Sequence, residues 1–309
     1  MNNTATGGDL PGDSHVPDLL LEVTREFYLY TVFFTAMAGN SLTLAVIYKY
    51  TEFHTITYTI IASQSVVNVL LSLTTVVDDI SDMVIHTPAG ALSYCLSSAI
   101  QVVFHLMNTL FHQVLVTAER YVAILYPLRY PTIVTRSRAV RGITLCWLTS
   151  LLEALILVFW NNMGSTQSCS TDIMNTYFVI FFTLAPIVIF SVLLFYMYFH
   201  ISKSARRMRK SVVDIHLNAS NQNYQGENMR MSVTISFTLA AFVLCWLPTV
   251  VYLSLQVSGV NLEQVYENVA IAVAKFHGTA NFIIYSFRMK KFRKRFKQIF
   301  RCSHCKHTR

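Results

Sequence analysis

Apolar residues along this chain gather in seven long stretches, which short polar segments separate. Each stretch runs for about 20 residues or more, the length that a helix needs to cross the hydrocarbon core of a membrane. They are residues 27–48, 56–77, 94–118, 142–160, 175–201, 231–257 and 264–287. Barrel strands would instead alternate apolar and polar positions in segments of about ten residues. The pattern therefore predicts an all-α membrane protein, a bundle of seven transmembrane helices.

The composition agrees with this prediction. The chain has 309 residues, of which 53% are hydrophobic and only 13% are charged. Soluble domains carry about 25% charged residues, so the composition favours a membrane protein. The metal-ligand spacings, nucleophile elbows and phosphate loops of common enzymes are absent from the sequence. We therefore predict no enzymatic activity and no metal site.

The distribution of charge predicts the orientation in the membrane. Of the 24 Lys and Arg residues, only Arg25 precedes the first stretch and only Lys275 lies deep inside one, while the others fall on one side. Because such residues stay in the cytoplasm, we expect an extracellular N-terminus and a cytoplasmic C-terminus at the plasma membrane. The net charge of +8 then reflects membrane topology, and we expect no nucleic-acid partner. Asn2 begins a sequon on the outer side and is a glycosylation candidate.

The segment that follows the seventh stretch mixes basic and apolar residues. Its apolar residues that share one helical face are Phe292, Phe296, Ile299 and Phe300. This pattern predicts a short amphipathic cytoplasmic helix that binds the anionic lipids of the inner leaflet. Cys302 and Cys305 follow and are palmitoylation candidates. A zinc cluster at these cysteines is disfavoured, because the ligands are too crowded for a tetrahedral site.

Short motifs narrow the class of membrane protein further. Glu119-Arg120-Tyr121 closes the third stretch, Cys245-Trp246-Leu247-Pro248 lies in the sixth, and Asn281 to Tyr285 ends the seventh. Gly39-Asn40 marks the first stretch and Trp147 the fourth. In this order and spacing the motifs resemble those of rhodopsin-like G-protein-coupled receptors. The resemblance implies an extracellular tail over residues 1–26, a receptor domain over 27–287, and an amphipathic helix with a cytoplasmic tail over 288–309.

The resemblance also implies a heterotrimeric G protein as partner and an activation switch. Glu119 is expected to hold Arg120 at rest and to release it on activation; the alternative is a snorkelling surface arginine. Pro248 removes a backbone hydrogen bond and kinks the sixth helix. Trp246 and Phe242 beside this kink are expected to change packing between two states, the alternative being simple core packing. The remaining switch candidates are Tyr121, Asn281 and Tyr285.

Two structural sites follow from the same comparison. Cys95 precedes Arg120 by about 37 Å of helix, which places Cys95 at the outer surface. Cys169 lies in an outer loop, in an oxidising compartment, and we expect it to form a disulfide with Cys95. Asn40, Asn68 and Asn281 are expected to form a polar core. Asn68 stands where most relatives have an Asp that helps to hold sodium, and the lost charge argues against such regulation.

The expected ligand is small and lies inside the bundle. The tail before the first stretch is too short to form a binding domain, so we expect a small molecule, a lipid or a short peptide. Aminergic relatives have an Asp where this chain has Val102, which argues against an amine held in that way. The candidate acids cluster at the outer end of the second stretch instead: Asp78, Asp79 and Asp82. Trp246 and Lys275 complete the predicted pocket.

Lys275 is the charge that most needs explanation. An ammonium deep in a spanning helix costs about 2.5–3.5 kcal/mol and marks a functional site. Helix geometry turns Asp79 to the bundle interior, about one turn from Lys275 in depth. Three hypotheses stay open: an ion pair with Asp79, a ligand contact, or an opsin-like Schiff base with retinal, the only cofactor considered. A channel or transporter is the further alternative, but inverted repeats and broken helices are absent from the sequence.

Overall fold

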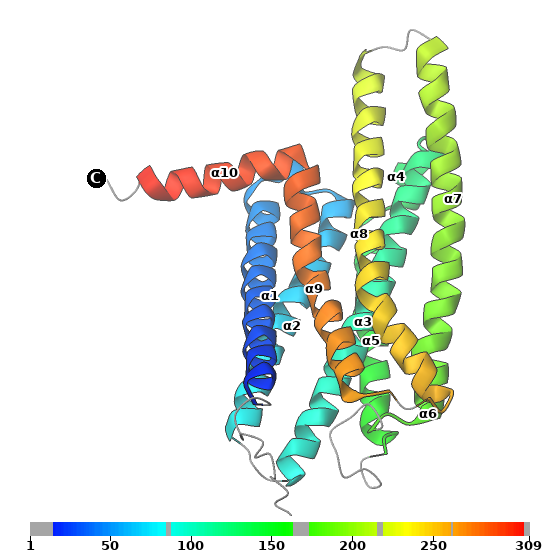
Figure 1. The fold of residues 1–309 in the computed structure, drawn as a ribbon. Helices are drawn as coiled ribbons and strands as arrows, with labels where there is room; N and C mark the ends of the chain where they lie inside the picture. Colours follow the sequence, from blue (N-terminus) through cyan, green and yellow to red (C-terminus); the bar gives the residue numbers. More distant parts are fainter. Residues whose placement is uncertain (1–14, 85–87, 163–172, 215–218, 261, 306–309) are drawn as a thin grey trace, which may run out of the picture.

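The structure is a computed structural model that describes residues 15–84, 88–162, 173–214, 219–260 and 262–305 (Figure 1). Its long helices run side by side, and a last helix lies across one end of the bundle. In chain order the elements are α1 (His15–Lys49), η1 (Thr51–Phe53), α2 (Ile56–Val84), α3 (Pro88–Leu125), α4 (Tyr130–Ile133), α5 (Arg136–Phe159), α6 (Thr176–Phe178), the π-helical η3 (Val179–Leu184), α7 (Ala185–Asp214), α8 (Ala219–Val257), α9 (Gln264–Arg288) and α10 (Lys290–Cys305). The predicted all-α fold is confirmed.

Six of the described helices are long and apolar enough to cross a membrane. Their spans are Val23–Lys49, Ile56–Val77, Ser93–Leu125, Arg136–Phe159, Thr176–Ser204 and Met229–Val257. These spans match the first six predicted stretches, and several extend further at the ends. Large apolar side chains such as Leu148, Leu152 and Phe195 point outward and are more than half exposed. Such a surface suits a lipid environment, in which outward apolar side chains meet hydrocarbon instead of water.

The seventh predicted stretch forms α9, which is more polar than the other spans. It contains Glu267, Lys275, His277 and Asn281 and packs against both α8 and α1. Glu267, His277 and Asn281 are buried. The polarity of α9 therefore comes from the face that it turns into the bundle.

Two prolines shape the helices that close the bundle on one side. Pro186 follows the π-helical turn η3 at the start of α7, where its missing N–H breaks the regular hydrogen-bond pattern. Pro248 lies inside α8, and Figure 1 shows that α8 bends before it ends at Val257. The kink predicted at Pro248 is thus part of the fold.

The helix α10 crosses the end of the bundle at which α1 and α9 finish (Figure 1). Phe292 is fully buried and Phe296 nearly so, because Phe292 packs against Phe53 and Tyr58, and Phe296 packs against Phe282 and Phe292. The first turns of the predicted amphipathic face therefore pack on protein, and binding of this helix to the inner leaflet stays a prediction. We call this end of the bundle, which carries Lys49, Arg136 and Lys290, the basic end.

Candidate functional site

A cavity opens between α1, α3, α8 and α9 at the end of the bundle opposite α10. The empty space in it, which includes the part open to solvent, is about 1130 Å³. A smaller hollow of about 440 Å³ adjoins it. The residues shared by the two are Tyr94, Ser98, Val102, Ile271 and Lys275. We call the two together the outer cavity.

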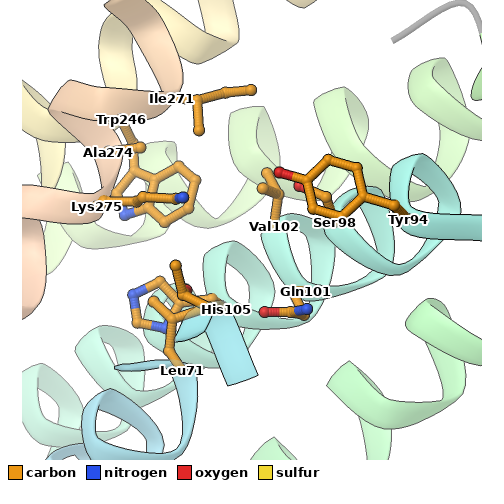
Figure 2. Close-up of a pocket in the computed structure, with 11 residues that line it drawn as sticks. Leu71, Tyr94, Ser98, Gln101, Val102, His105, Trp246, Ile271, Ala274 and Lys275 are labelled. Atoms are coloured by element: carbon orange, nitrogen blue, oxygen red, sulfur yellow. The ribbon is translucent and has the colours of Figure 1, made fainter. Parts of the chain in front are cut away.

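Lys275 reaches the outer cavity from α9. It lines both of its parts and also a third hollow against Phe33 and Ala36 of α1. Figure 2 shows Lys275 and Trp246 facing Val102 and Ser98 of α3 across the smaller hollow. The structure therefore brings together three residues that the sequence placed in the pocket: Val102, Trp246 and Lys275.

The outer cavity also holds an acid that the sequence analysis missed. Glu267 lies about two helical turns before Lys275 on α9 and is only 6% exposed. The hydroxyl of Tyr252 donates a hydrogen bond to its Oε2 over 3.1 Å. At the rim, Arg25 and Glu26 form an ion pair of 2.9 Å. The cavity thus offers a ligand charges of both signs.

Several predicted residues lie at the limits of what the structure describes. Asp78, Asp79 and Asp82 belong to α2, but their side chains fall outside the described residues, so the Lys275–Asp79 pair stays a prediction. Cys95 is buried and disulfide-bonded. Its predicted partner, Cys169, and the sequon at Asn2 fall outside the described residues. The side chains of Cys302 and Cys305 at the end of α10 do so as well, and these modifications also stay predictions.

Four buried rings pack together at the inner end of the outer cavity, where His105 and Trp246 line it, and we call the four rings the floor. They are His105 of α3, Phe242 and Trp246 of α8, and His277 of α9. The ring centre of His105 lies 5.6 Å from that of Trp246 and 6.0 Å from that of His277. Phe242 packs against His277 with ring centres 5.8 Å apart. The two switch candidates of α8 therefore contact histidines that the sequence analysis did not single out.

A buried amide network joins α1, α2, α3 and α9 below this floor. Asn68 donates to Asn40 over 3.0 Å, and Asn40 donates to the carbonyls of Ala36 and Gly278. Gln64 donates to Asn68 and to the hydroxyl of Thr109. The predicted polar core thus includes Asn40 and Asn68. Asn281 contacts His277 instead, with 3.4 Å between its Nδ2 and the imidazole Nε2.

The Glu119-Arg120-Tyr121 motif lies at the basic end of the bundle. Glu119 and Arg120 form a bidentate ion pair, and their side chains are only 3% and 7% exposed. Thr57 of α2 donates to Glu119 and accepts from Arg120, while the hydroxyl of Tyr130 donates to Glu119. Tyr121 lies next to Tyr126 and His200. Arg120 is therefore held inside the bundle, in the closed arrangement expected at rest.

Contacts between α10 and η1 fasten the same end. Arg295 donates to Glu52 over 2.7 Å, and its guanidinium lies 4.4 Å from the ring centre of Tyr50. The hydrogen bond from Arg295, with the positive charges of α10, lowers the pKa of Glu52. Tyr285, the last residue of the seventh-stretch motif, is buried in the same cluster as Phe292.

The comparison with known families agrees with this arrangement. Residues 39–285 match the family described as 7 transmembrane receptor (rhodopsin family). This chain belongs to the rhodopsin family of receptors. The match begins at Gly39 in α1 and extends through α9. The receptor is therefore a signalling receptor of a non-enzymatic family and a multi-pass membrane protein, and its seven-helix bundle includes the polar α9.

Phe282, within the motif that ends the seventh stretch, brings α1 and α9 into close contact. The helix α9 runs without interruption from Gln264 to Arg288 through this residue. The Phe282 ring lies against Gly39, so close that a Cβ atom at Gly39 would collide with it. Gly39 is thus required for the close approach of α1 and α9 at this level.

Proposed function

We propose that this receptor binds a small extracellular ligand in the outer cavity and couples to heterotrimeric G proteins at the basic end. The observation that carries the proposal is the position of Trp246. It lines the outer cavity on one side and contacts His105 on the other, in a helix, α8, that packs against α3, the helix of Arg120. A ligand that shifts Trp246 would bias the bend of α8 at Pro248, a small change that a packed bundle amplifies.

The proposed orientation in the plasma membrane follows from charge. The basic end, with Lys49, Arg136 and α10, faces the cytoplasm, and the outer cavity faces the outside. In this orientation an extracellular molecule enters the cavity directly. It also places Arg120 at the surface where G proteins are found.

The lining of the cavity defines the ligand class. Apolar walls that include Val102, Ile173 and Leu253 suit an apolar body. The Tyr252–Glu267 pair offers a site for a donor group, and Lys275 offers a site for an acceptor or an acid. We therefore propose a compact amphiphilic ligand with polar groups at two depths, for which a short peptide or a polar lipid is suitable.

The coupling is tested by measuring guanine-nucleotide exchange. Purified heterotrimers of each Gα class are added to membranes that contain the receptor. We expect exchange with at least one class, and we expect Arg120→Ala to reduce it to the level of membranes without receptor. Arg141→Ala changes an exposed arginine near the same end and serves as the matched control. Exchange that persists in Arg120→Ala at equal expression, or exchange with no class, contradicts the proposal.

Retinal binding is a second candidate function, because Lys275 lines a cavity with apolar walls. Retinal added to the purified receptor would then produce a visible absorption band that Lys275→Ala abolishes. An acid near the Schiff base is needed to keep it protonated, so Asp79→Asn would move this band to the near ultraviolet. A wild-type spectrum without a visible band eliminates the photoreceptor and leaves the ligand-binding function.

A further inference from the structure

Two buried imidazoles in the floor of the outer cavity have ring nitrogens without hydrogen-bond partners. His105 is 1% exposed and His277 is fully buried. Within the described residues, neither nitrogen of His105 has a partner, and Nδ1 of His277 has none. Buried polar groups are almost always hydrogen-bonded, so three such atoms at one place indicate a missing partner.

The distance between the two rings is close to the spacing that one shared metal ion requires. A Zn–N bond of about 2.0 Å places the centre of each bound imidazole about 3.2 Å from the ion. Two such ring centres lie about 5.2 Å apart at the tetrahedral angle that zinc prefers. The ring centres of His105 and His277 are 6.0 Å apart, so an approach of about 0.8 Å between α3 and α9 would bring them to this spacing.

A metal-bound histidine needs a hydrogen-bond partner for its other ring nitrogen, and Asn281 can be this partner for His277. Asn281 places its amide nitrogen 3.4 Å from Nε2 of His277, and its Oδ1 has no partner among the described residues. Turning this amide by half a rotation lets Oδ1 accept a hydrogen bond from Nε2–H. With the proton on Nε2, the Nδ1 atom keeps a lone pair that can bind a metal ion. In known metal sites the other ring N–H of a metal-bound histidine is hydrogen-bonded in the same way.

We propose that His105 and His277 bind a borderline divalent transition-metal ion such as Zn²⁺ beneath the ligand cavity. Two imidazoles favour such ions over sodium or magnesium, which prefer oxygen ligands. Asn68 is not a ligand, because both ends of its amide are engaged by Asn40 and Gln64. His105 lines the smaller hollow, through which the ion and water ligands reach the site from outside.

The ion would act as a bridge between α3 and α9. The site lies beside Trp246, whose ring centre is 5.6 Å from that of His105. An ion that fixes the two helices close to their present spacing stabilises this conformation over one in which they separate. A metal ion that holds α3 and α9 together would inhibit signalling. This inhibition rests on the proposed function, whereas binding of the metal does not.

Thermal unfolding of the purified full-length receptor, with Zn²⁺ and with Mg²⁺, tests the binding. We expect Zn²⁺ to raise the Tm by several degrees and Mg²⁺ to have no effect. The variants His105→Phe and His277→Phe keep an aromatic ring and should each lose the rise. His200→Phe, on α7 at the basic end, should keep it. A wild-type receptor that Zn²⁺ does not stabilise overturns the proposal and leaves a water molecule as the missing partner.

The spectrum of bound Co²⁺ keeps the test decisive if a ring variant fails to fold. Nitrogen and water ligands give a visible ligand-field band without the sulfur-to-cobalt band of thiolate ligands. The cysteines at the end of α10 would produce the sulfur band, which the variant Cys302→Ser/Cys305→Ser would remove. A sulfur band that persists in the Cys302→Ser/Cys305→Ser variant, or a rise in Tm that survives in His277→Phe, places the metal elsewhere and overturns the proposal.

Discussion

Two of the buried polar regions of this receptor, the basic end and the floor of the outer cavity, differ in how completely their polar atoms are paired. At the basic end, Glu119, Arg120, Thr57 and Tyr130 satisfy one another in a closed network. In the floor of the outer cavity, the nitrogens of His105 and Trp246 lack partners among the described residues. A closed network fixes one arrangement, whereas an open one has capacity for a further group. The comparison indicates that the basic end is fixed in one arrangement and that the floor has capacity for a further group.

Breaking the closed network should have the largest effect on stability. Glu119→Ala leaves the Arg120 guanidinium buried without a carboxylate, and breaking a buried ion pair by removing one partner costs about 3–5 kcal/mol. We expect a clear fall in the Tm of the purified receptor. The exposed pair Arg25–Glu26 provides the control, because Glu26→Ala removes a carboxylate from an ion pair that water already screens. Equal shifts in the two variants would refute the distinction between the networks.

Packing between the two regions should have the next largest effect. A methyl group at Gly39 meets the Phe282 ring, and overpacking of this kind costs about 1–3 kcal/mol. Gly278→Ala is the matched control on the facing helix, because its new methyl would lie 3.6 Å from Ala36 and Asn68, an ordinary contact. Thermal unfolding of both variants measures the difference. If Gly39→Ala is as stable as Gly278→Ala, α1 and α9 are free to separate and the contact does not constrain them.

Two tryptophans sharpen the comparison at the level of one hydrogen bond: Trp147, which is half-buried, and Trp246, which is buried. Trp147 donates from Nε1 to Ser63 over 2.9 Å, whereas Nε1 of Trp246 has no partner among the described residues. Replacing each with Phe removes a similar volume, but only Trp147→Phe also removes a hydrogen bond worth about 0.5–1.5 kcal/mol. We expect Trp147→Phe to unfold at the lower temperature. The opposite order would show that Nε1 of Trp246 is bonded in the receptor as purified.

Acidification should have the smallest effect, at the contact between α10 and η1. The folded-state pKa of Glu52 is lowered, so its contribution is present above the ordinary Glu pKa of about 4.3 and disappears as the pH falls through the lowered value. The Tm difference between the receptor and Glu52→Gln should therefore be constant near neutral pH and vanish in acid. Because the pair is partly exposed, high salt should also reduce the difference. A Tm difference that persists in acid would show that it arises from packing and not from the charge of Glu52.

The sequence was sufficient to predict the helices and which residues gather at each end of the bundle, because both depend on local patterns. Runs of apolar residues defined six spans, and the seventh was recognisable although its inner face is polar. The pairing of His105 with His277 was beyond reach, since each is a single polar residue in an apolar stretch. The two meet only when α3 and α9 pack. Glu267 was missed for a related reason: its burial depends on Tyr252 of the neighbouring helix.

Phe282 shows what a motif within one helix leaves out. The helix α9 is continuous through this residue. The larger consequence lies on the neighbouring helix, where the ring requires a glycine at position 39. The effect of a substitution therefore has to be judged together with the residue on the neighbouring helix that accommodates it.

The π-helical turn Val179–Leu184 has a consequence for the numbering of positions along this helix. A π-turn contains about one residue more than an α-turn, so a helical wheel drawn without it rotates everything upstream by about 100°. An alignment without a gap would therefore assign Tyr177 to the wrong face when α7 is superimposed on a regular helix. Deleting one residue from the turn would restore regular α-helical geometry and rotate the first residues of the span about the helix axis. The turn is in effect a one-residue insertion, and it decides which side chains at that end of the helix face the bundle.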